Sequence, residues 1–264
     1  MSDTKENNVE ELVVFSIENR VAKLVLNRQE KLNAMTPAMS DRIASLADRC
    51  NDDPEVRAVI VTGVGRAFCC GSDIRELDTY ISPWAARMKR EYCLAIAAIN
   101  KPTIAAVNGL AMGGGLETAL SCDIRIATGN ARFAAPEIKL GWIGGGGMAV
   151  YLRAAIGPSR AARMLYTGDL IDAETALRWG LVDELYDDAE ALMNAAETLA
   201  DTIAARAPIA AQAAKLNLNA AASMPLDKAV AYERELRTVC FATEDAAEGK
   251  AAFREKRAAV FHGI

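Results

Sequence analysis

Two glutamates lie beside glycine-rich segments that could bring the backbone close to a ligand. Glu117 follows Gly113-Gly114-Gly115, and Glu137 follows Pro136 in a loop. Glycine permits such an approach, and N–H groups at the start of a helix are available as donors. Two donors from neighbouring loops could bind one oxyanion, with carboxyl groups beside it for acid–base chemistry. Each glutamate also has a simpler interpretation, Glu117 as a complement to its helix dipole and Glu137 as a solvated surface acid.

A second segment of chemical interest, GRAFCCGSDI at residues 65–74, directly follows a predicted buried strand. Ligands of α/β proteins bind at the carboxyl ends of strands, where this segment and residues 108–117 both lie. Asp73 is predicted to cap the helix after it. The adjacent pair Cys69-Cys70 forms no C-x-x-C motif, and the spacing of the six cysteines fits no zinc site. We therefore predict reduced thiols and no metal.

The sequence predicts no histidine-based catalysis. The single histidine, His262, is the third residue from the end. Acid–base chemistry therefore falls to carboxylates, Lys, Tyr or Cys. The run Gly144–Gly147 with Ala149 satisfies a loose dinucleotide fingerprint, but it follows no convincing strand. We therefore predict no nicotinamide cofactor.

Strands alternate with helices over the first two-thirds of the chain, and the last third is almost all helix. Short apolar runs rich in β-branched residues predict buried strands, and this alternation favours a mostly parallel α/β sheet. The predicted strands are residues 12–17, 21–26, 58–63, 103–109 and 123–128. We predict a core over residues 1–195 and a C-terminal helical region over residues 196–264.

Composition limits the partners of the protein. The chain has 264 residues and a net charge of −5, without the basic footprint typical of nucleic-acid binding. Its polar N-terminus resembles neither a signal nor a transit peptide. No window approaches the roughly 18 apolar residues of a membrane span. We expect a cytoplasmic protein with no nucleic-acid or membrane partner.

Six segments resemble, in order, the signatures of the enoyl-CoA hydratase/isomerase (crotonase) superfamily. They are NRQEKLNAM (27–35), GRAFCCGSDI (65–74), NGLAMGGGLETALSCDIRIA (108–127), APEIKLGW (135–142), YTGDLIDAETALRWGLVDEL (166–185) and EGKAAFREKR (248–257). The resemblance implies a spiral of ββα repeats with a C-terminal helical trimerisation region. It also implies an acyl-CoA substrate, no cofactor apart from the coenzyme A of that substrate, and a homotrimer or dimer of trimers.

The resemblance also implies roles for individual residues. The backbone N–H groups of Cys70 and Gly114 would bind the thioester oxygen. Glu117 would act as the base toward water and Glu137 as the acid at Cα, and the presence of both favours hydration of a 2-enoyl-CoA. The residues implied to contact CoA or the thioester segment are Lys31, Leu32, Ala34, Ala67, Ser72, Asp73, Ile74, Phe253 and Lys256.

Several alternatives remain open at the level of sequence. One is a related reaction on the same fold: enoyl-CoA isomerisation, carnitinyl-CoA-type dehydration, or hydratase/lyase chemistry on an aromatic acyl-CoA. A lyase would need a phenol near the thioester, and the sequence does not place Tyr80, Tyr92 or Tyr232. A non-catalytic binding protein and an NAD-linked oxidoreductase are the other two. Gly144, where the family has Pro, and the variable position Leu116 leave the acyl group undetermined.

Overall fold

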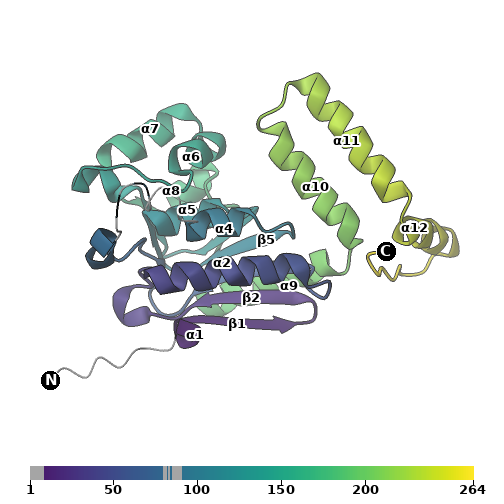
Figure 1. Ribbon diagram of the computed structural model, residues 1–264, viewed down its shortest axis with the longest axis horizontal. Helices are drawn as coiled ribbons and strands as arrows, with labels where there is room; N and C mark the ends of the chain where they lie inside the picture. The colour runs from purple at the N-terminus through teal and green to yellow at the C-terminus, as the bar shows by residue number, and fades with distance from the viewer. Residues whose placement is uncertain (1–8, 80–81, 83, 85–90) are drawn as a thin grey trace.

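A six-stranded sheet forms the centre of the protein (Figure 1). This is a computed structural model, and it describes residues 9–79, 82, 84 and 91–264. The first two strands are antiparallel, with Val13 opposite Leu26, and the others pair in parallel. In spatial order the strands are β1 (Val13–Glu18), β2 (Val21–Leu26), β3 (Ala58–Gly63), β5 (Thr103–Val107), β7 (Ile124–Thr128) and β10 (Glu184–Tyr186).

A second, four-stranded sheet lies beside the first. Its strands in spatial order are β4 (Ala67–Cys69), β6 (Leu110–Met112), β8 (Arg132–Ala134) and β9 (Ile171–Asp172). Each of β4, β6 and β8 follows a strand of the larger sheet, so two strands and then a helical segment recur along the chain. This order confirms the predicted spiral of ββα repeats. The small strands are absent from the predicted elements, because two or three residues are too short for a period-2 pattern.

The central strands divide their side chains between two apolar clusters. In β3, Val59 and Val61 face one cluster, while Ala58 and Ile60 face the other. Alternation of this kind follows from the pleat, and burial on both faces explains the uninterrupted apolar run AVIVTG. The first cluster also contains residues of α2 (Pro37–Asp52), and the second contains residues of α9 (Ala189–Ala204).

Helices cover the sheets and form the C-terminal region. The Thr36 hydroxyl accepts the N–H of Met39 and so caps the N-terminus of α2. The remaining α-helices are α1 (Val9–Leu12), α4 (Tyr92–Ala97), α5 (Gly114–Leu120), α6 (Met148–Ile156), α7 (Pro158–Thr167), α8 (Ala173–Trp179), α10 (Pro208–Ala221), α11 (Leu226–Phe241) and α12 (Glu244–Glu255). Short 3₁₀ helices are η1 (Gln29–Lys31), η2 (Ile74–Thr79) and η3 (Pro136–Leu140).

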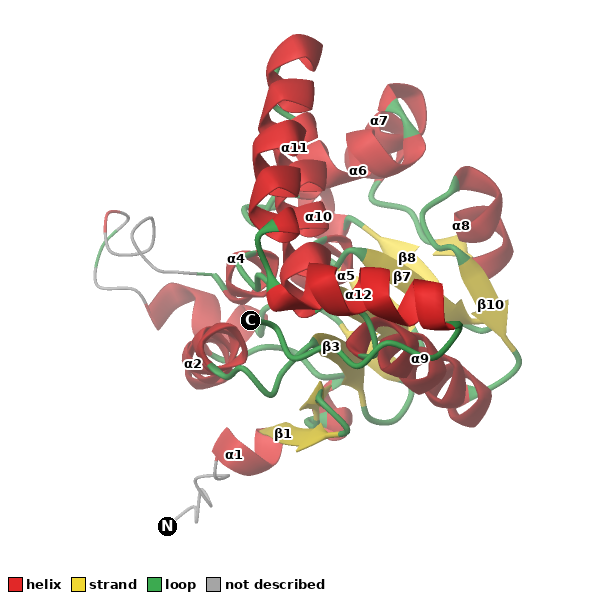
Figure 2. Cartoon of the chain, turned by 90° about the vertical axis from the view of Figure 1, so that its right-hand side faces the viewer, coloured by secondary structure: helices red, strands yellow, loops and turns green. Residues whose placement is uncertain are grey.

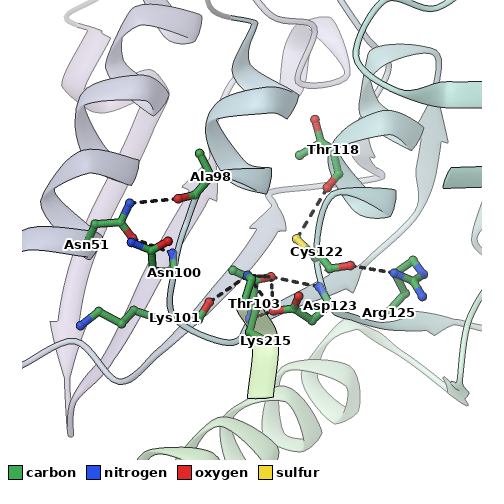
Figure 3. A network of polar contacts seen from close by, with 10 residues as sticks. All are labelled: Asn51, Ala98, Asn100, Lys101, Thr103, Thr118, Cys122, Asp123, Arg125 and Lys215. Atoms are coloured by element: carbon green, nitrogen blue, oxygen red, sulfur yellow. Dashed lines mark hydrogen bonds and ion pairs between the residues drawn. The ribbon is translucent and has the colours of Figure 1, made fainter. Parts of the chain in front are cut away.

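The last three helices extend away from the sheets (Figures 1 and 2). One buried cation joins α10 to the core: the ammonium of Lys215 lies 2.8 Å from the Asp123 carboxylate and donates to the carbonyl oxygen of Lys101 at 3.0 Å (Figure 3). The same carboxylate accepts the N–H of Thr103 at 2.8 Å. The division predicted at residue 195 falls within α9, which packs against the larger sheet.

Candidate active site

A cavity of about 310 Å³ opens where the two glycine-rich segments meet. Its wall includes six of the residues to which the family resemblance gives a catalytic or binding role: Cys70, Ser72, Ile74, Gly114, Glu117 and Glu137. Three segments far apart in the sequence supply them: residues 70–74 between β4 and η2, the first turn of α5, and η3. The spiral therefore gathers both glutamates and both glycine-rich segments at one place.

Glu117, in the first turn of α5, is buried and only 4% exposed. Its Oε1 atom accepts the backbone N–H of Gly146 at 2.7 Å and that of Met148 at 3.1 Å. Burial raises the pKa of this carboxyl, the two N–H groups lower it in part, and the charge of Glu137 raises it further. The two backbone donors fix the carboxyl group in place and leave Oε2 without a hydrogen-bond partner among the described residues.

Glu137 lies on η3 in a different environment. Its side chain is half-buried, and a Cβ built on Gly113 would lie 3.1 Å from its Oε1 atom. Burial raises the pKa of Glu137, opposed only by its own backbone N–H. The cavity wall thus contains the carboxyl residues Glu91, Glu117 and Glu137; Glu117 is held by two backbone N–H groups of a neighbouring loop, and Glu137 is not. Unequal environments of this kind suit two carboxyl groups to different proton-transfer roles.

Gly114 provides one free backbone N–H. It is the first residue of α5, so its N–H has no partner within the helix. Within the described part of the chain, its N–H has no other acceptor. A Cβ built on Gly71 would lie 3.1 Å from the nitrogen of Gly114, so the two glycine-rich segments lie in contact at this point.

The prediction for Cys70 is wrong. Its backbone N–H donates to the carbonyl oxygen of Leu32 at 3.1 Å and is therefore not available to a ligand. Burial also raises the pKa of the Cys70 thiol to about 11, so the side chain is protonated and no nucleophile.

Ser72 carries the free N–H of this segment instead. Met35 pairs with Ser72 as a parallel β-bridge, in which the hydrogen bonds are made by the carbonyl of Gly71 and the N–H of Asp73. The N–H of Ser72 therefore points away from Met35, on the side where Ser72 lines the cavity. It meets no acceptor within residues 9–79, 82, 84 and 91–264.

The residues expected to contact CoA divide into several groups. Lys31 is exposed at the end of η1, beside Leu32 and Ala34, which are half-buried. Leu32 has a left-handed backbone, with φ of 52°, and its carbonyl holds the Cys70 N–H. Ala67 is buried in β4. Neither Ala67 nor Lys31, Leu32 or Ala34 lines the cavity.

Asp73 has a structural role. Its carboxylate lies 2.9 Å from Arg75 and 3.0 Å from Arg28, and the hydrogen bond from Arg75 holds its pKa well below the usual range. The predicted cap is confirmed, because Oδ1 accepts the backbone N–H of Arg75 at the start of η2. The structure does not bring this carboxylate into the cavity.

Phe253 lies on α12 and Lys256 directly follows the last residue of that helix, and neither lines the cavity of its own chain. The Phe253 side chain is 86% exposed. Of the two family departures, Gly144 lines the cavity, whereas Leu116 is fully buried in the core and does not contact it.

Several residues that line the cavity carry no local signal in the sequence. Tyr92 and Cys93 at the start of α4 line the cavity, as do Trp142 and Ile143 after η3. Tyr92 was one of three candidate phenols, and no local pattern distinguished it. Of the other two, Tyr232 lies on α11 outside the cavity, and Tyr80 lies outside the described residues.

Comparisons with known proteins agree with this geometry. The model of the enoyl-CoA hydratase/isomerase family matches residues 16–263. A probable enoyl-CoA hydratase of Mycobacterium tuberculosis is 39% identical, over 95% of this chain and 98% of its own. An (E)-benzylidenesuccinyl-CoA hydratase of Thauera aromatica is 38% identical, over 95% and 99%. The crystal structure of an enoyl-CoA hydratase from Bacillus anthracis, 32% identical, superposes with a TM-score of 0.90 over 96% of this chain and 100% of that one. The chain belongs to the enoyl-CoA hydratase/isomerase family.

The described residues include neither a membrane span nor a metal-binding cluster. None of their helices is both long enough and apolar enough to cross a bilayer. Nor do these residues contain three or more His, Cys, Asp or Glu side chains grouped so as to hold a metal ion.

Proposed function

We propose that this protein is an enoyl-CoA hydratase, which adds water to the double bond of a 2-enoyl-CoA thioester. The observation that carries the proposal is the pair of carboxyl groups, both with raised pKa values, in one cavity with two free backbone N–H groups. Hydration needs a base for water, an acid for Cα and a stabilised enolate between them. The cavity offers each of these groups.

Glu117 is the base in this proposal. Its Oε1 atom is held by Gly146 and Met148, so Oε2 is left to orient water. As the water oxygen bonds to Cβ, its proton passes to Glu117 and the electron pair of the double bond moves onto the thioester as an enolate. The N–H groups of Gly114 and Ser72 bind the enolate oxygen. Each such donor contributes on the order of 3 kcal/mol in comparable sites.

Glu137 completes the reaction by protonating Cα of the enolate, which restores the thioester carbonyl. Its environment suits an acid, because burial without a backbone donor from another residue favours the protonated form. After one turnover Glu117 carries the proton that Glu137 has lost, and exchange with water resets both groups.

The test follows the loss of the conjugated thioester absorbance of crotonyl-CoA. Glu117→Gln and Glu137→Gln should each lower kcat by about 10²- to 10⁴-fold, while the dissociation constant of a saturated acyl-CoA stays nearly unchanged. Exposed Glu233→Gln on α11 serves as the control and should retain full activity. Intact acyl-CoA binding with no loss of absorbance would refute hydration of this substrate and favour a related reaction of the family.

We also propose that the acyl group is apolar and that the active protein is a trimer or a dimer of trimers. Trp142, Ile143 and Leu140 line the cavity with partly exposed apolar side chains, which suits a hydrocarbon chain or ring.

The proposed oligomer rests on the C-terminal helices. Large apolar side chains are exposed on α10–α12, as is typical of association surfaces: Leu218, Leu226, Val239, Phe241 and Phe253. In such an oligomer Phe253 and Lys256 could reach CoA bound to a neighbouring subunit. Sedimentation velocity measures the state, and a monomer at micromolar concentration would contradict it.

A further inference from the structure

The phenol of Tyr92 lies between the two segments that carry the free N–H groups. Tyr92 begins α4 and is 3% exposed, yet it lines the cavity. Its hydroxyl oxygen lies 3.3 Å from the Oγ atom of Ser72. A Cβ on Gly114 would overlap this hydroxyl, so the oxygen packs directly against the Cα of that glycine. The hydroxyl thus contacts both residues whose N–H groups are free.

The single contact between the two hydroxyls uses only one of their two hydrogens. Tyr92 and Ser72 each carry one O–H, and either of them can donate in the single contact between them. One hydroxyl hydrogen then remains, and no other hydrogen bond joins either hydroxyl to a described residue. An unused donor in a buried place is unfavourable. Since both residues line the cavity, a ligand oxygen there can accept this hydrogen.

We propose that the Tyr92 hydroxyl is a third hydrogen-bond donor to the thioester oxygen, beside the N–H groups of Gly114 and Ser72, an inference that rests on the proposed function. A phenol is more acidic than an alcohol and is the better donor of the two. In this arrangement the Ser72 hydroxyl donates to Tyr92 and Tyr92 donates to the substrate, so each bond polarises the next. Burial raises the pKa of Tyr92 well above its ordinary value, which keeps the phenol protonated and able to donate.

The donor matters most when charge develops on the oxygen. A hydrogen bond to the enolate is stronger than one to the neutral thioester, because bonds to charged acceptors are stronger. Loss of the Tyr92 hydroxyl should therefore lower kcat more than it raises KM. If the Tyr92 side chain only filled space against Gly114, Tyr92→Phe would change neither kcat nor KM, since the ring remains.

The kinetic test compares two variants. Tyr92→Phe removes the proposed donor, and we expect kcat with crotonyl-CoA to fall by about 10- to 100-fold. Ser72→Ala keeps the backbone N–H and removes only the hydroxyl that supports Tyr92, and we expect a fall of about 2- to 5-fold. A Tyr92→Phe enzyme within about twofold of the parent would overturn the proposal. So would a larger loss in Ser72→Ala, which would identify Ser72 as the donor.

A spectroscopic test separates this proposal from the proposed function. In 4-(dimethylamino)cinnamoyl-CoA the absorption moves to longer wavelength when the thioester oxygen accepts hydrogen bonds. Bound to a Glu117→Gln protein, it should show a red shift that decreases when Tyr92→Phe is added, with little change in the dissociation constant. An unchanged shift would overturn the role of Tyr92 even if crotonyl-CoA is hydrated. If the red shift depends on Tyr92 but the parent protein does not hydrate crotonyl-CoA, the result would support Tyr92 as a donor and refute the proposed hydratase function.

Discussion

The loops of the cavity and the C-terminal helices are held in place by opposite means. Asn33 donates to the carbonyl oxygens of Ala67 and Phe68, and Asn108 joins Gly63 to Gly65, so buried amides fix the backbone around the site. The helices α10–α12 instead expose large apolar side chains, and one buried ion pair through Lys215 joins α10 to the core. Buried hydrogen bonds thus surround the site, whereas the extension presents apolar side chains on its surface.

The largest effect is expected at the cavity loops. Gly114→Ala would place a methyl group on the Tyr92 hydroxyl and displace the donors from one another. We expect kcat to fall by on the order of 10²- to 10³-fold, the cost of losing an oxyanion donor, with stopped-flow measurement of crotonyl-CoA hydration as the readout. Gly129→Ala is the matched control, since the nearest atom to its Cβ is 3.8 Å away. Equal rates in both variants would contradict the close packing inferred at Gly114.

The pH dependence of kcat/KM tests the two carboxyl groups together. In the proposed mechanism Glu117 works ionised. Burial raises the pKa of Glu117, so activity should fall with decreasing pH at values above the roughly 4.3 of a free glutamate. Glu137 works protonated, and its raised pKa moves the loss of activity at high pH upward. We expect a bell-shaped profile, whose high-pH limb disappears from the residual activity of Glu137→Gln. A profile flat between pH 4 and 6 would argue against Glu117 as the base.

The next largest effect is expected at the ion pair between Lys215 and Asp123, which joins α10 to the core. Lys215→Met removes the cation that pairs with Asp123, and we expect the free energy of unfolding to fall by about 2 kcal/mol in urea denaturation. The exposed Lys228 on α11 provides the control, and Lys228→Met should change stability by less than about 0.5 kcal/mol. If both variants are equally stable, the extension is held by contacts other than this pair.

The smallest effect on the chain itself is expected at the tip of the extension. Phe253→Ala removes a side chain that is 86% exposed, so the stability of a single chain should change by less than about 0.5 kcal/mol. In an oligomer that uses Phe253 against a neighbouring subunit's CoA, KM for acyl-CoA should rise several-fold with little change in kcat. A KM equal to that of the parent enzyme would remove Phe253 from the binding site.

The elements that the sequence predicted well are those with strong local signals. The run AVIVTG predicted β3 because burial on both faces requires apolar residues throughout. The cap at Asp73 depends only on residues up to Arg75. The small sheet, the cavity role of Tyr92 and the shift from Cys70 to Ser72 had no such signal, because each depends on a partner distant in sequence.

By itself, the sequence determined the longer strands, the helical last third, the family resemblance and the two glutamates, since these depend on local periodicity and on residue types in order. Only the tertiary structure decided which backbone N–H groups are free. The pairing of Met35 with Ser72 and the bond from Cys70 to Leu32 decide that Ser72, two residues further on, faces the cavity. A donor is available to a ligand only if no other segment accepts its hydrogen, and that depends on contacts between distant segments that a local pattern does not record.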